Sequence, residues 1–332
     1  MIIFLQLPDP ESTDVEYRWR STVEKVVLYE KISQQENVVK LFNTWVEDDA
    51  LYLQMELCEK SLLHFILENV HMEERHTWNV MVDILQALEF IHAREFVHLD
   101  IKPENILLGY DDRYKLADFD LIHDMKVTSI DHIRAGDDKY RAPEVTEDDF
   151  QPDPKNDIFS LGMTLLEMAG DFYLPNGGPL WMRLRRNNFP SSQLKGSKLR
   201  LNFYHHYCLS TTEADVSESL INTLHLMLKR DTNERPSAAE LLNLDVVKTK
   251  RIERHESLGP ISFVVQKLAN QNAIKLRENL AFMRKLEERA DLSDLDRFAR
   301  SRSPTPDIDR HLSGMRTALA RSYADDEIDE KV

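Results

Sequence analysis

The segment from His98 to Leu107 combines the residue types that a phosphoryl-transfer site needs, with an aspartate at position 100, a lysine at 102 and an asparagine at 105. In this chemistry a carboxylate accepts the proton of the attacking hydroxyl, and a nearby cation offsets the charge of the transferring group. We assign Asp100 as the proton acceptor, Lys102 as the phosphate-facing cation and Asn105 as a ligand of Mg²⁺. The alternative, a solvated loop between a helix and a strand, leaves their spacing unexplained.

A second carboxylate follows thirteen residues after Asn105, in the triplet Asp118-Phe119-Asp120. At this spacing we expect Asp118 to hold Mg²⁺ that bridges the β- and γ-phosphates of ATP. Such triplets usually end in glycine, so Asp120 is expected to occupy a left-handed backbone position at some energetic cost. Taken alone, the triplet is typical of a surface turn; its distance from Asn105 favours the metal site.

Two further motifs are expected to brace this chemistry. Glu144 closes the segment that begins at Asp118, and we expect it to form a buried ion pair with Arg235. Asp157 opens a strongly apolar segment, and its position resembles that of the protein-kinase aspartate that holds the backbone of the catalytic loop, here 98–107. Its alternative role is that of a carboxylate favoured by the dipole at a helix N-terminus.

The apolar periodicity places these motifs on alternating elements. It predicts a helix at 22–33, a hairpin of strands at 38–46 and 51–57, a long helix at 73–92, short strands at 106–108 and 114–116, and helices after Pro154. Residues 1–7 are apolar and predict a buried strand or an ordinary terminus. The pattern indicates an α+β chain in which a strand-rich part precedes a helix-rich lobe.

Composition excludes several other classes of protein. The net charge of −16 and the pI near 5.2 argue against a nucleic-acid partner. Two cysteines, Cys58 and Cys208, are too few for a disulfide framework, so the chain is expected to be intracellular, in the nucleus or cytoplasm. No run approaches the 18 to 20 apolar residues of a membrane span.

The charge is divided unevenly along the chain. Residues 1–245 carry a net charge of −18, whereas residues 246–332 carry +2. We therefore expect residues 1–20 to be a divergent N-terminus, 21–245 to be the catalytic domain, with a partial N-lobe at 21–55 and a C-lobe at 56–245, and 246–332 to be a helical and then disordered tail.

The motifs quoted above, with Leu51 to Cys58, Gly136 to Glu144, Asp157 to Glu167 and Leu174 to Gly178, resemble the Wee/Myt protein kinases. The likeness extends over residues 21–245 and is strongest to the membrane-associated branch, although that branch has a spanning segment after its kinase domain. The resemblance implies a bilobal kinase fold with a truncated, β-rich N-lobe and a complete helical C-lobe. It also implies ATP and Mg²⁺ as cofactors and a cyclin-dependent kinase with its cyclin as the protein substrate, inhibited by phosphorylation of tyrosine or threonine before mitosis.

The same resemblance assigns the nucleotide pocket. It implies Met55 as the gatekeeper, the stretch from Glu56 to Cys58 as the hinge that pairs with adenine, and Leu107 as the floor of the adenine site. Met55 and Leu107 also fit ordinary core positions. Glu24 is the candidate for the helix glutamate that pairs with the strand lysine of the family.

The N-terminal part departs from the family pattern. The first glycine is Gly109 and residues 1–24 contain no lysine, so a glycine-rich phosphate loop and the strand lysine are both missing from this stretch. Two hypotheses follow. The chain is either a Wee/Myt-type kinase, as a short isoform or divergent paralogue, or a catalytically impaired pseudokinase that acts as a binding and regulatory module. Intact Asp100, Lys102, Asn105 and Asp118 favour the first.

Overall fold

The computed structural model describes residues 2–6, 15–47, 50–68, 72–126, 136–146, 150–170, 174–188 and 216–259. The chain separates into two compact units, Met1–Leu268 and Ala269–Val332. The second unit lies outside the described residues, so the expectations for the tail beyond residue 259 do as well. Within the described residues, no helix has both the length and the apolarity needed to cross a bilayer.

The N-terminal sheet is antiparallel and has the strand order β1-β3-β2, with bounds β1 (Ile2–Gln6), β2 (Leu41–Glu47) and β3 (Ala50–Met55). The predicted hairpin is confirmed, and the rings of Trp45 and Tyr52 stack across it at 5.2 Å. β2 starts later than expected because Val38 forms an isolated parallel bridge with Leu116 instead. β1 pairs along the whole of β3 from position 2 to 6, so the predicted N-terminal strand is also present.

Helix α1 (Val15–Ile32) follows β1 and carries Tyr29 and Ile32, which are both buried. It starts seven residues before the predicted position of Thr22. Residues 15–21 contain neither glycine nor proline, so nothing in them ends a helix, but they lack the apolar repeat from which the helix was predicted. The stretch expected to be a divergent N-terminus therefore contains β1 and the first turns of α1.

A second antiparallel sheet, with the order β4-β6-β7, connects the N-terminal sheet to the helical part. Its strands are β4 (Cys58–Ser61), β6 (Ile106–Gly109) and β7 (Tyr114–Leu116). The short strands β5 (Phe96–Val97) and β8 (His123–Asp124) form a separate pair. The catalytic segment thus lies between β5 and β6, and the Asp118 triplet lies between β7 and β8.

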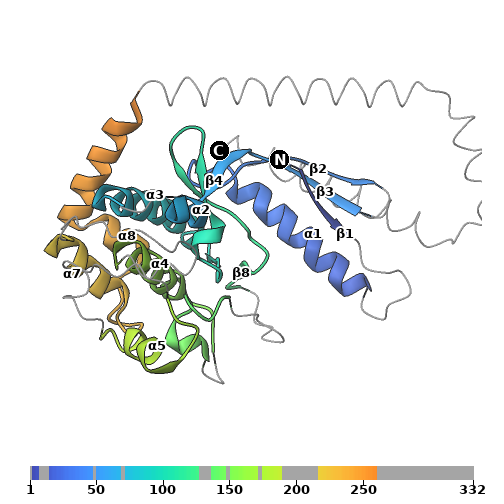
Figure 1. Ribbon diagram of the computed structural model, residues 1–332. Helices are drawn as coiled ribbons and strands as arrows, with labels where there is room; N and C mark the ends of the chain where they lie inside the picture. The colour runs from blue at the N-terminus through green and yellow to red at the C-terminus, as the bar shows by residue number, and fades with distance from the viewer. Residues whose placement is uncertain are drawn as a thin grey trace, which may run out of the picture. The chain divides into compact units, whose positions relative to one another are not determined.

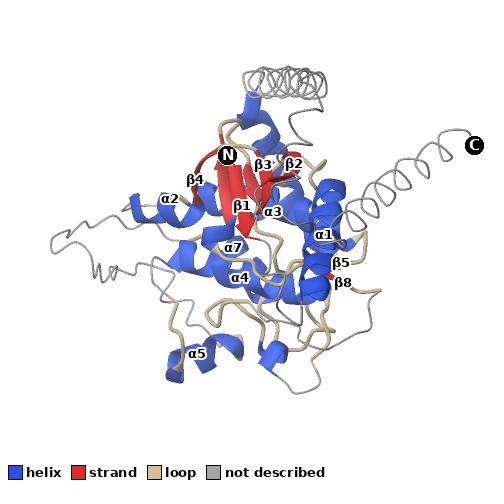
Figure 2. Cartoon of the chain, turned by 90° about the vertical axis from the view of Figure 1, so that its right-hand side faces the viewer, coloured by secondary structure: helices blue, strands red, loops and turns tan. Residues whose placement is uncertain are grey.

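The remaining elements are mostly helical. They are α2 (Leu62–Glu68), α3 (Glu74–His92), the 3-10 helices η1 (Pro103–Asn105) and η2 (Pro143–Thr146), α4 (Pro154–Gly170), α5 (Gly178–Arg185), α7 (Glu218–Met227), α8 (Ala238–Leu242) and a helix at 245–259. Figure 1 shows the N-terminal sheet and α1 in blue and the C-terminal helices in green to orange. Figure 2 shows β1, β2, β3 and β4, in red, near the N-terminus, with β5 and β8 apart from them. The expected bilobal α+β kinase fold is confirmed.

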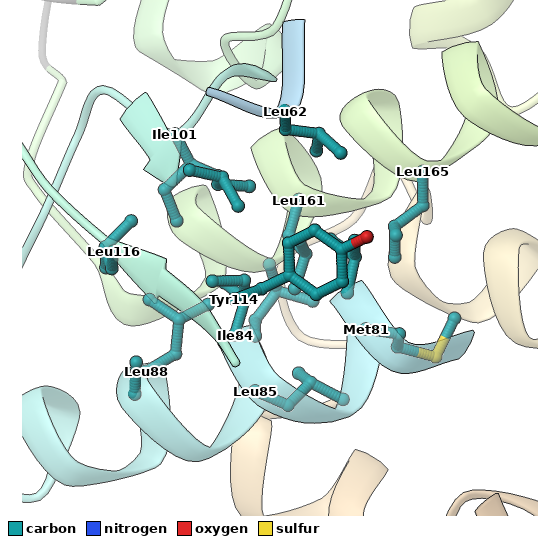
Figure 3. Close-up of a cluster of buried hydrophobic side chains, with 14 of the residues drawn as sticks. Leu62, Met81, Ile84, Leu85, Leu88, Ile101, Tyr114, Leu116, Leu161 and Leu165 are labelled. Atoms are coloured by element: carbon teal, nitrogen blue, oxygen red, sulfur yellow. The ribbon is translucent and has the colours of Figure 1, made fainter. Parts of the chain in front are cut away.

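The hydrophobic core of the helical part packs against the catalytic loop. Figure 3 shows Leu161 and Leu165 of α4 facing a layer of apolar side chains from α3, together with Ile101 of the loop and Leu116 of β7. Ile101 is only 1% exposed. Burying an aliphatic side chain of this size stabilises its position by roughly 1.5 to 3 kcal/mol. Because Ile101 is next to Asp100, packing fixes the loop where its chemistry is placed.

Candidate active site

Asp157 anchors the backbone of the catalytic loop. Its Oδ2 accepts hydrogen bonds from the backbone N–H of His98 and from His92 Nε2, and its Oδ1 accepts one from the N–H of Leu99, all at 2.8 Å. Leu99 adopts φ +65°, a left-handed conformation that costs about 1 to 2 kcal/mol in a residue with a Cβ. The buried Asp157 carboxylate compensates for this strain, which confirms the expected role.

The Asp100 carboxylate is surrounded by donors. Its Oδ2 accepts from Lys102 Nζ at 2.8 Å and from Asn105 Nδ2 at 2.8 Å, and its Oδ1 accepts from the N–H of Asp137 at 3.3 Å. Burial alone would lower the pKa of Lys102, but the hydrogen bond to Asp100 and its charge outweigh burial, so the pKa of Lys102 is raised. The lysine is therefore a cation at neutral pH. The structure thus brings the three predicted loop residues into one cluster.

Gly136 lies in close contact with this cluster. A Cβ on Gly136 would stand 2.4 Å from the carbonyl oxygen of Leu99 and 2.7 Å from Asp100 Oδ1, distances that real Cβ atoms do not adopt. The absence of a side chain allows the chain to pass so close to Asp100 that the next residue, Asp137, donates its N–H to the carboxylate. Sequence reasoning used Gly136 and Asp137 only as part of a family resemblance.

The two predicted metal ligands, Asn105 and Asp118, lie at the same end of the β6–β7 hairpin. The N–H of Ala117 donates to the carbonyl of Asn105 at 2.9 Å, which joins the residues that precede and follow the two strands. Asn105 Nδ2 is used by Asp100, so its amide oxygen is the atom that can face a cation. Asp118 is exposed, and no hydrogen bond to its carboxylate occurs within the described ranges. An amide oxygen and a carboxylate form a donor set that fits Mg²⁺.

The Asp118 triplet has its aromatic residue turned inward. Phe119 is 5% exposed, and its ring lies 4.7 Å from the ring of Tyr29 on α1 and 4.9 Å from His98 of the catalytic loop. The expectation that Asp120 adopts the left-handed conformation is wrong: Asp118 does so, with φ +61°. With Phe119 buried on one side, this turn at Asp118 leaves its carboxylate on the exposed side, and aspartate tolerates that region better than most residues.

The predicted hinge is held by ion pairs. Glu56 donates its N–H to the carbonyl of Lys40 at 2.8 Å, so a nucleotide base could use only its carbonyl. The Glu56 carboxylate contacts Lys115 Nζ at 2.7 Å, and Lys115, which is fully buried, also lies 3.0 Å from Asp111. Burial alone would lower the pKa of Lys115, but the charges of Glu56 and Asp111 outweigh it and the pKa is raised.

The other two predicted pocket residues flank this hinge. Cys58 starts β4 opposite Gly109, and burial, followed by the charge of Glu56, raises the pKa of its thiol to about 12. The thiol is therefore protonated at neutral pH and acts as a packing group. Leu107 is half-buried in β6, between Ser61 and Lys115 on the neighbouring strands, and Met55 is buried at the end of β3. Their roles toward adenine remain predictions.

The far end of the segment is fixed by the expected ion pair. Arg235 is fully buried and forms two hydrogen bonds with Glu144, Nη1 to Oε1 at 2.8 Å and Nη2 to Oε2 at 3.2 Å. Asn156 of α4 donates to the same Oε1 at 2.7 Å. A bidentate pair of this kind is directional as well as strong, so the prediction is confirmed.

A profile of the family described as protein kinase domain matches residues 10–247. The chain belongs to the protein kinase family. It is 36% identical over 222 residues to the membrane-associated tyrosine- and threonine-specific cdc2-inhibitory kinase of Drosophila melanogaster, a match that covers 67% of this chain and 38% of the relative. It is 30% identical over 240 residues to the mitosis inhibitor protein kinase wee1 of Schizosaccharomyces pombe, covering 68% and 26%.

These relatives confirm the Wee/Myt resemblance. A third, the cdc2-inhibitory kinase wee-1.3 of Caenorhabditis elegans, is 36% identical over 234 residues, which cover 70% of this chain and 32% of the relative. The kinase chain spans about a third of the length of such curated relatives.

Three charged residues of this kinase domain were missed as site or support residues. Lys25 of α1 donates from Nζ to the carbonyl of Asp120, so α1 brings a cation next to the Asp118 triplet. Lys115 and Arg254 are buried, whereas a lysine or arginine in a sequence normally predicts a solvent-exposed side chain. The pairing of each depends on a carboxylate distant in sequence, which no local pattern reveals. Glu24 lies on α1, as predicted, but its side chain is outside what the structure describes.

Proposed function

We propose that this chain is a Wee/Myt-type protein kinase that transfers the γ-phosphoryl group of ATP to a tyrosine or threonine of a cyclin-dependent kinase and thereby inhibits entry into mitosis. The observation that carries the proposal is the Asp100 cluster, in which one carboxylate is hydrogen-bonded to both Lys102 and Asn105. Folding alone does not demand this combination. The seryl, cysteinyl and histidyl nucleophiles of other transferases have no part in it.

In the proposed reaction the hydroxyl oxygen of the substrate forms a new bond to the γ-phosphorus while the bond from that phosphorus to the ADP oxygen breaks. The Asp100 carboxylate accepts the hydroxyl proton and orients the oxygen. Lys102 is kept cationic by the same carboxylate, and its Nζ lies 2.8 Å from Asp100 Oδ2. Its charge would therefore stabilise the phosphoryl group during transfer. The N–H of Asp137 holds the second carboxylate oxygen.

Mg²⁺, when bound, would neutralise charge on the β- and γ-phosphates of ATP. Asn105 and Asp118 would hold the ion through their oxygens, and the Glu56 carbonyl and the Cys58 region would receive the adenine. Because Phe119 is buried while Asp118 is exposed, the Asp118 carboxylate would be accessible to the ion. Positioning and electrostatic stabilisation account for most of phosphoryl-transfer catalysis, and the described residues supply both.

The substrate class is proposed from the names of the relatives. The Drosophila and Caenorhabditis proteins are named tyrosine- and threonine-specific inhibitors of cdc2, and the Schizosaccharomyces protein is named a mitosis inhibitor. Because each of these similarities covers about two thirds of this chain or more, we carry the same target to it. The complex with a cyclin is part of the same proposal.

The test is a transfer assay with this chain, Mg²⁺-ATP and a catalytically inactive cyclin-dependent kinase bound to its cyclin. We expect phosphorylation of tyrosine or threonine, read by mass spectrometry, and a rise in melting temperature on adding Mg²⁺-ATP. Asp100→Asn should remove the transfer and keep the thermal shift. Asp245→Asn, which alters an exposed carboxylate at the start of the last described helix, is the matched control and should leave both unchanged.

Absence of transfer together with absence of a Mg²⁺-ATP shift would overturn the proposal and support the pseudokinase alternative. Transfer that persists in Asp100→Asn would instead show that another group accepts the proton.

A further inference from the structure

Helix α5 (Gly178–Arg185) has two chemically different faces. Trp181, Leu184 and Arg185 fall on one side of the helix and are turned toward the protein: Leu184 and Arg185 are buried and Trp181 is half-buried. The spacing i, i+3, i+4 explains why these three share a face. The opposite side carries Met182 and Arg183, with Arg186 one residue beyond the helix, and all three are exposed. Figures 1 and 2 both place α5 at the edge of the helical lobe.

The inner face fixes α5 to the segment that leads to Asp100. Trp181 Nε1 donates to the carbonyl of Asp138 at 3.0 Å, and Arg185 Nη2 donates to the carbonyls of Asp138 and Arg141. The guanidinium of Arg185 also stacks on the ring of Trp181 at 3.7 Å. Asp138 directly follows Asp137, whose N–H contacts the Asp100 carboxylate. Helix α5 is therefore fixed to the segment that borders the catalytic carboxylate.

The outer face is apolar and basic. Met182, on this side, is 50% exposed, and Leu180, which lies at the border between the two faces, is 36% exposed. Neither Arg183 nor Arg186 has a carboxylate partner within the part of the chain that the structure describes. Aliphatic side chains bordered by arginine are the composition enriched in the contact regions of proteins.

A hollow of about 530 Å³ continues from this face. Its lining is Arg186, Asn187, Lys229, Arg230, Asp231 and Glu234. Lys229 is paired with Glu234 at 3.2 Å, and the Asp231 carboxylate accepts the N–H of Asn233 at 2.9 Å. Arg230, which is exposed, has no ion-pair partner in the described ranges. Guanidinium groups that have no carboxylate partner among the described residues thus border the hollow, in a chain with a net charge of −16.

From these features we propose that the outer face of α5, together with the hollow beside it, docks an acidic surface of the protein substrate that also offers apolar side chains. Met182 and Leu180 contact the apolar part, and Arg183, Arg186 and Arg230 receive the carboxylates. This inference rests on the proposed function, because it takes the substrate to be a folded protein. Charge complementarity carries it: an anionic partner is attracted to this face and is repelled by the rest of residues 1–245, which are acidic overall.

The test compares a folded substrate with a short one. The probes are the intact, catalytically inactive cyclin-dependent kinase with its cyclin, and a peptide of about fifteen residues around its acceptor tyrosine and threonine. The variant Arg183→Glu/Arg186→Glu reverses two exposed charges without touching the inner face. Arg251→Glu, an exposed arginine on the helix at 245–259, is the matched control.

We expect the double variant to raise the KM for the intact protein about tenfold and to weaken the dependence of this KM on salt. The reason is that charges at the rim of an interface act mainly on the rate of association. Phosphorylation of the peptide, the KM for ATP and the melting temperature should stay unchanged. The Arg251→Glu variant should match the unmodified chain in every measurement.

Four outcomes are decisive. An unchanged KM for the intact protein, or an equal loss on protein and peptide, overturns the docking surface. If the unmodified chain phosphorylates neither probe, the proposed function fails, and direct binding of the intact complex to immobilised chain still judges the surface: weaker binding by the double variant supports it and equal binding overturns it. A dimer that light scattering detects and the double variant abolishes would assign the face to a second copy of this chain instead.

Discussion

Arg254 and Asp83, which are 171 residues apart in the chain, form a buried ion pair in which Nη2 lies 2.8 Å from Oδ2. Arg254 is 3% exposed and Asp83 is fully buried. Asp83 also accepts the N–H of Tyr114 at 2.9 Å, and Arg254 Nη1 lies 3.1 Å from Asp112 Oδ2. The helix at 245–259 is therefore fixed to the β6–β7 turn.

The same turn braces the predicted hinge from its other side. Asp111 lies 3.0 Å from Lys115 Nζ, and Lys115 reaches Glu56 at 2.7 Å. The ion pairs of Arg254 and those of Lys115 are thus joined through the adjacent residues Asp111 and Asp112. They connect the last described helix to Glu56, the residue that would face adenine. The expected boundary of the catalytic domain at 245 coincides with the first residue of this helix, and both Val247 and Leu258 on it are buried. We infer that the helix belongs to the kinase unit.

The first prediction concerns this ion pair. Arg254→Ala leaves a buried carboxylate at Asp83 without its partner, so the free energy of unfolding should fall by about 3 to 5 kcal/mol in urea titrations. Arg251→Ala, three residues earlier on the same helix and exposed, should change it by less than about 0.5 kcal/mol. In a double-mutant cycle, Asp83→Ala should add less to Arg254→Ala than it costs alone. Strictly additive losses would show that the two side chains are not coupled.

The second prediction uses the close approach of Gly136 to Asp100. Gly136→Ala forces a Cβ to within 2.7 Å of Asp100 Oδ1 unless the segment shifts, so kcat should fall by about a hundredfold, as expected when a reacting group is displaced by about an ångström. The KM for ATP should remain the same. Gly177→Ala is the control, because a Cβ there meets no atom within 4 Å. Equal activities of the two variants would refute the assigned role of Gly136.

The third prediction concerns Asp157, which holds the left-handed turn at Leu99. Asp157→Ala leaves two buried N–H groups unpaired, each worth about 1 to 3 kcal/mol, so the variant should lose stability and kcat together. Asp157→Asn retains one acceptor oxygen and should lose less on both measures. An Asp157→Ala variant with full kcat would show that the loop is held by the packing of Ile101 alone.

The fourth prediction is a pH dependence from His98. Its Nδ1 accepts the N–H of Asp100 at 3.2 Å and its Nε2 donates to the carbonyl of Ala117 at 3.0 Å, so the ring is neutral in the native state. Burial lowers the pKa of His98 below its usual value of 6.5. Below about pH 6.5 the histidine of the unfolded chain binds a proton, whereas the folded ring stays neutral. The contribution of His98 to the free energy of unfolding is therefore fully present above this pH and decreases as the pH falls.

The measurement is the free energy of unfolding between pH 7.5 and 5.0. His98 should contribute a slope of up to about 1.4 kcal/mol per pH unit on the acid side, and His98→Asn should remove that contribution. The matched control replaces the exposed His255 by asparagine and tests whether the change of slope depends on the buried ring. A slope that is identical in the unmodified chain and His98→Asn would contradict the assignment.

Some features followed from the sequence because their information is local. The long helix at 73–92 was predicted to within one residue, since its apolar repeat is continuous from Trp78 to Ile91. The spacing of Asp100, Lys102 and Asn105 on one short loop left few arrangements of their side chains. Helix α1 was placed late because its first turns have no such repeat, and Asp120 was given the left-handed conformation that Asp118 adopts.

By itself, the sequence determined the kinase family, the elements with strong periodicity and the residues of the catalytic loop, because these depend on residue type and short spacing. Only the tertiary structure decided which charges are buried and with which partners. Arg254 with Asp83, Lys115 with Glu56 and Asp137 with Asp100 join segments that are 37 to 171 residues apart. The physical reason is that a buried charge requires a partner of opposite sign, and the fold alone selects that partner.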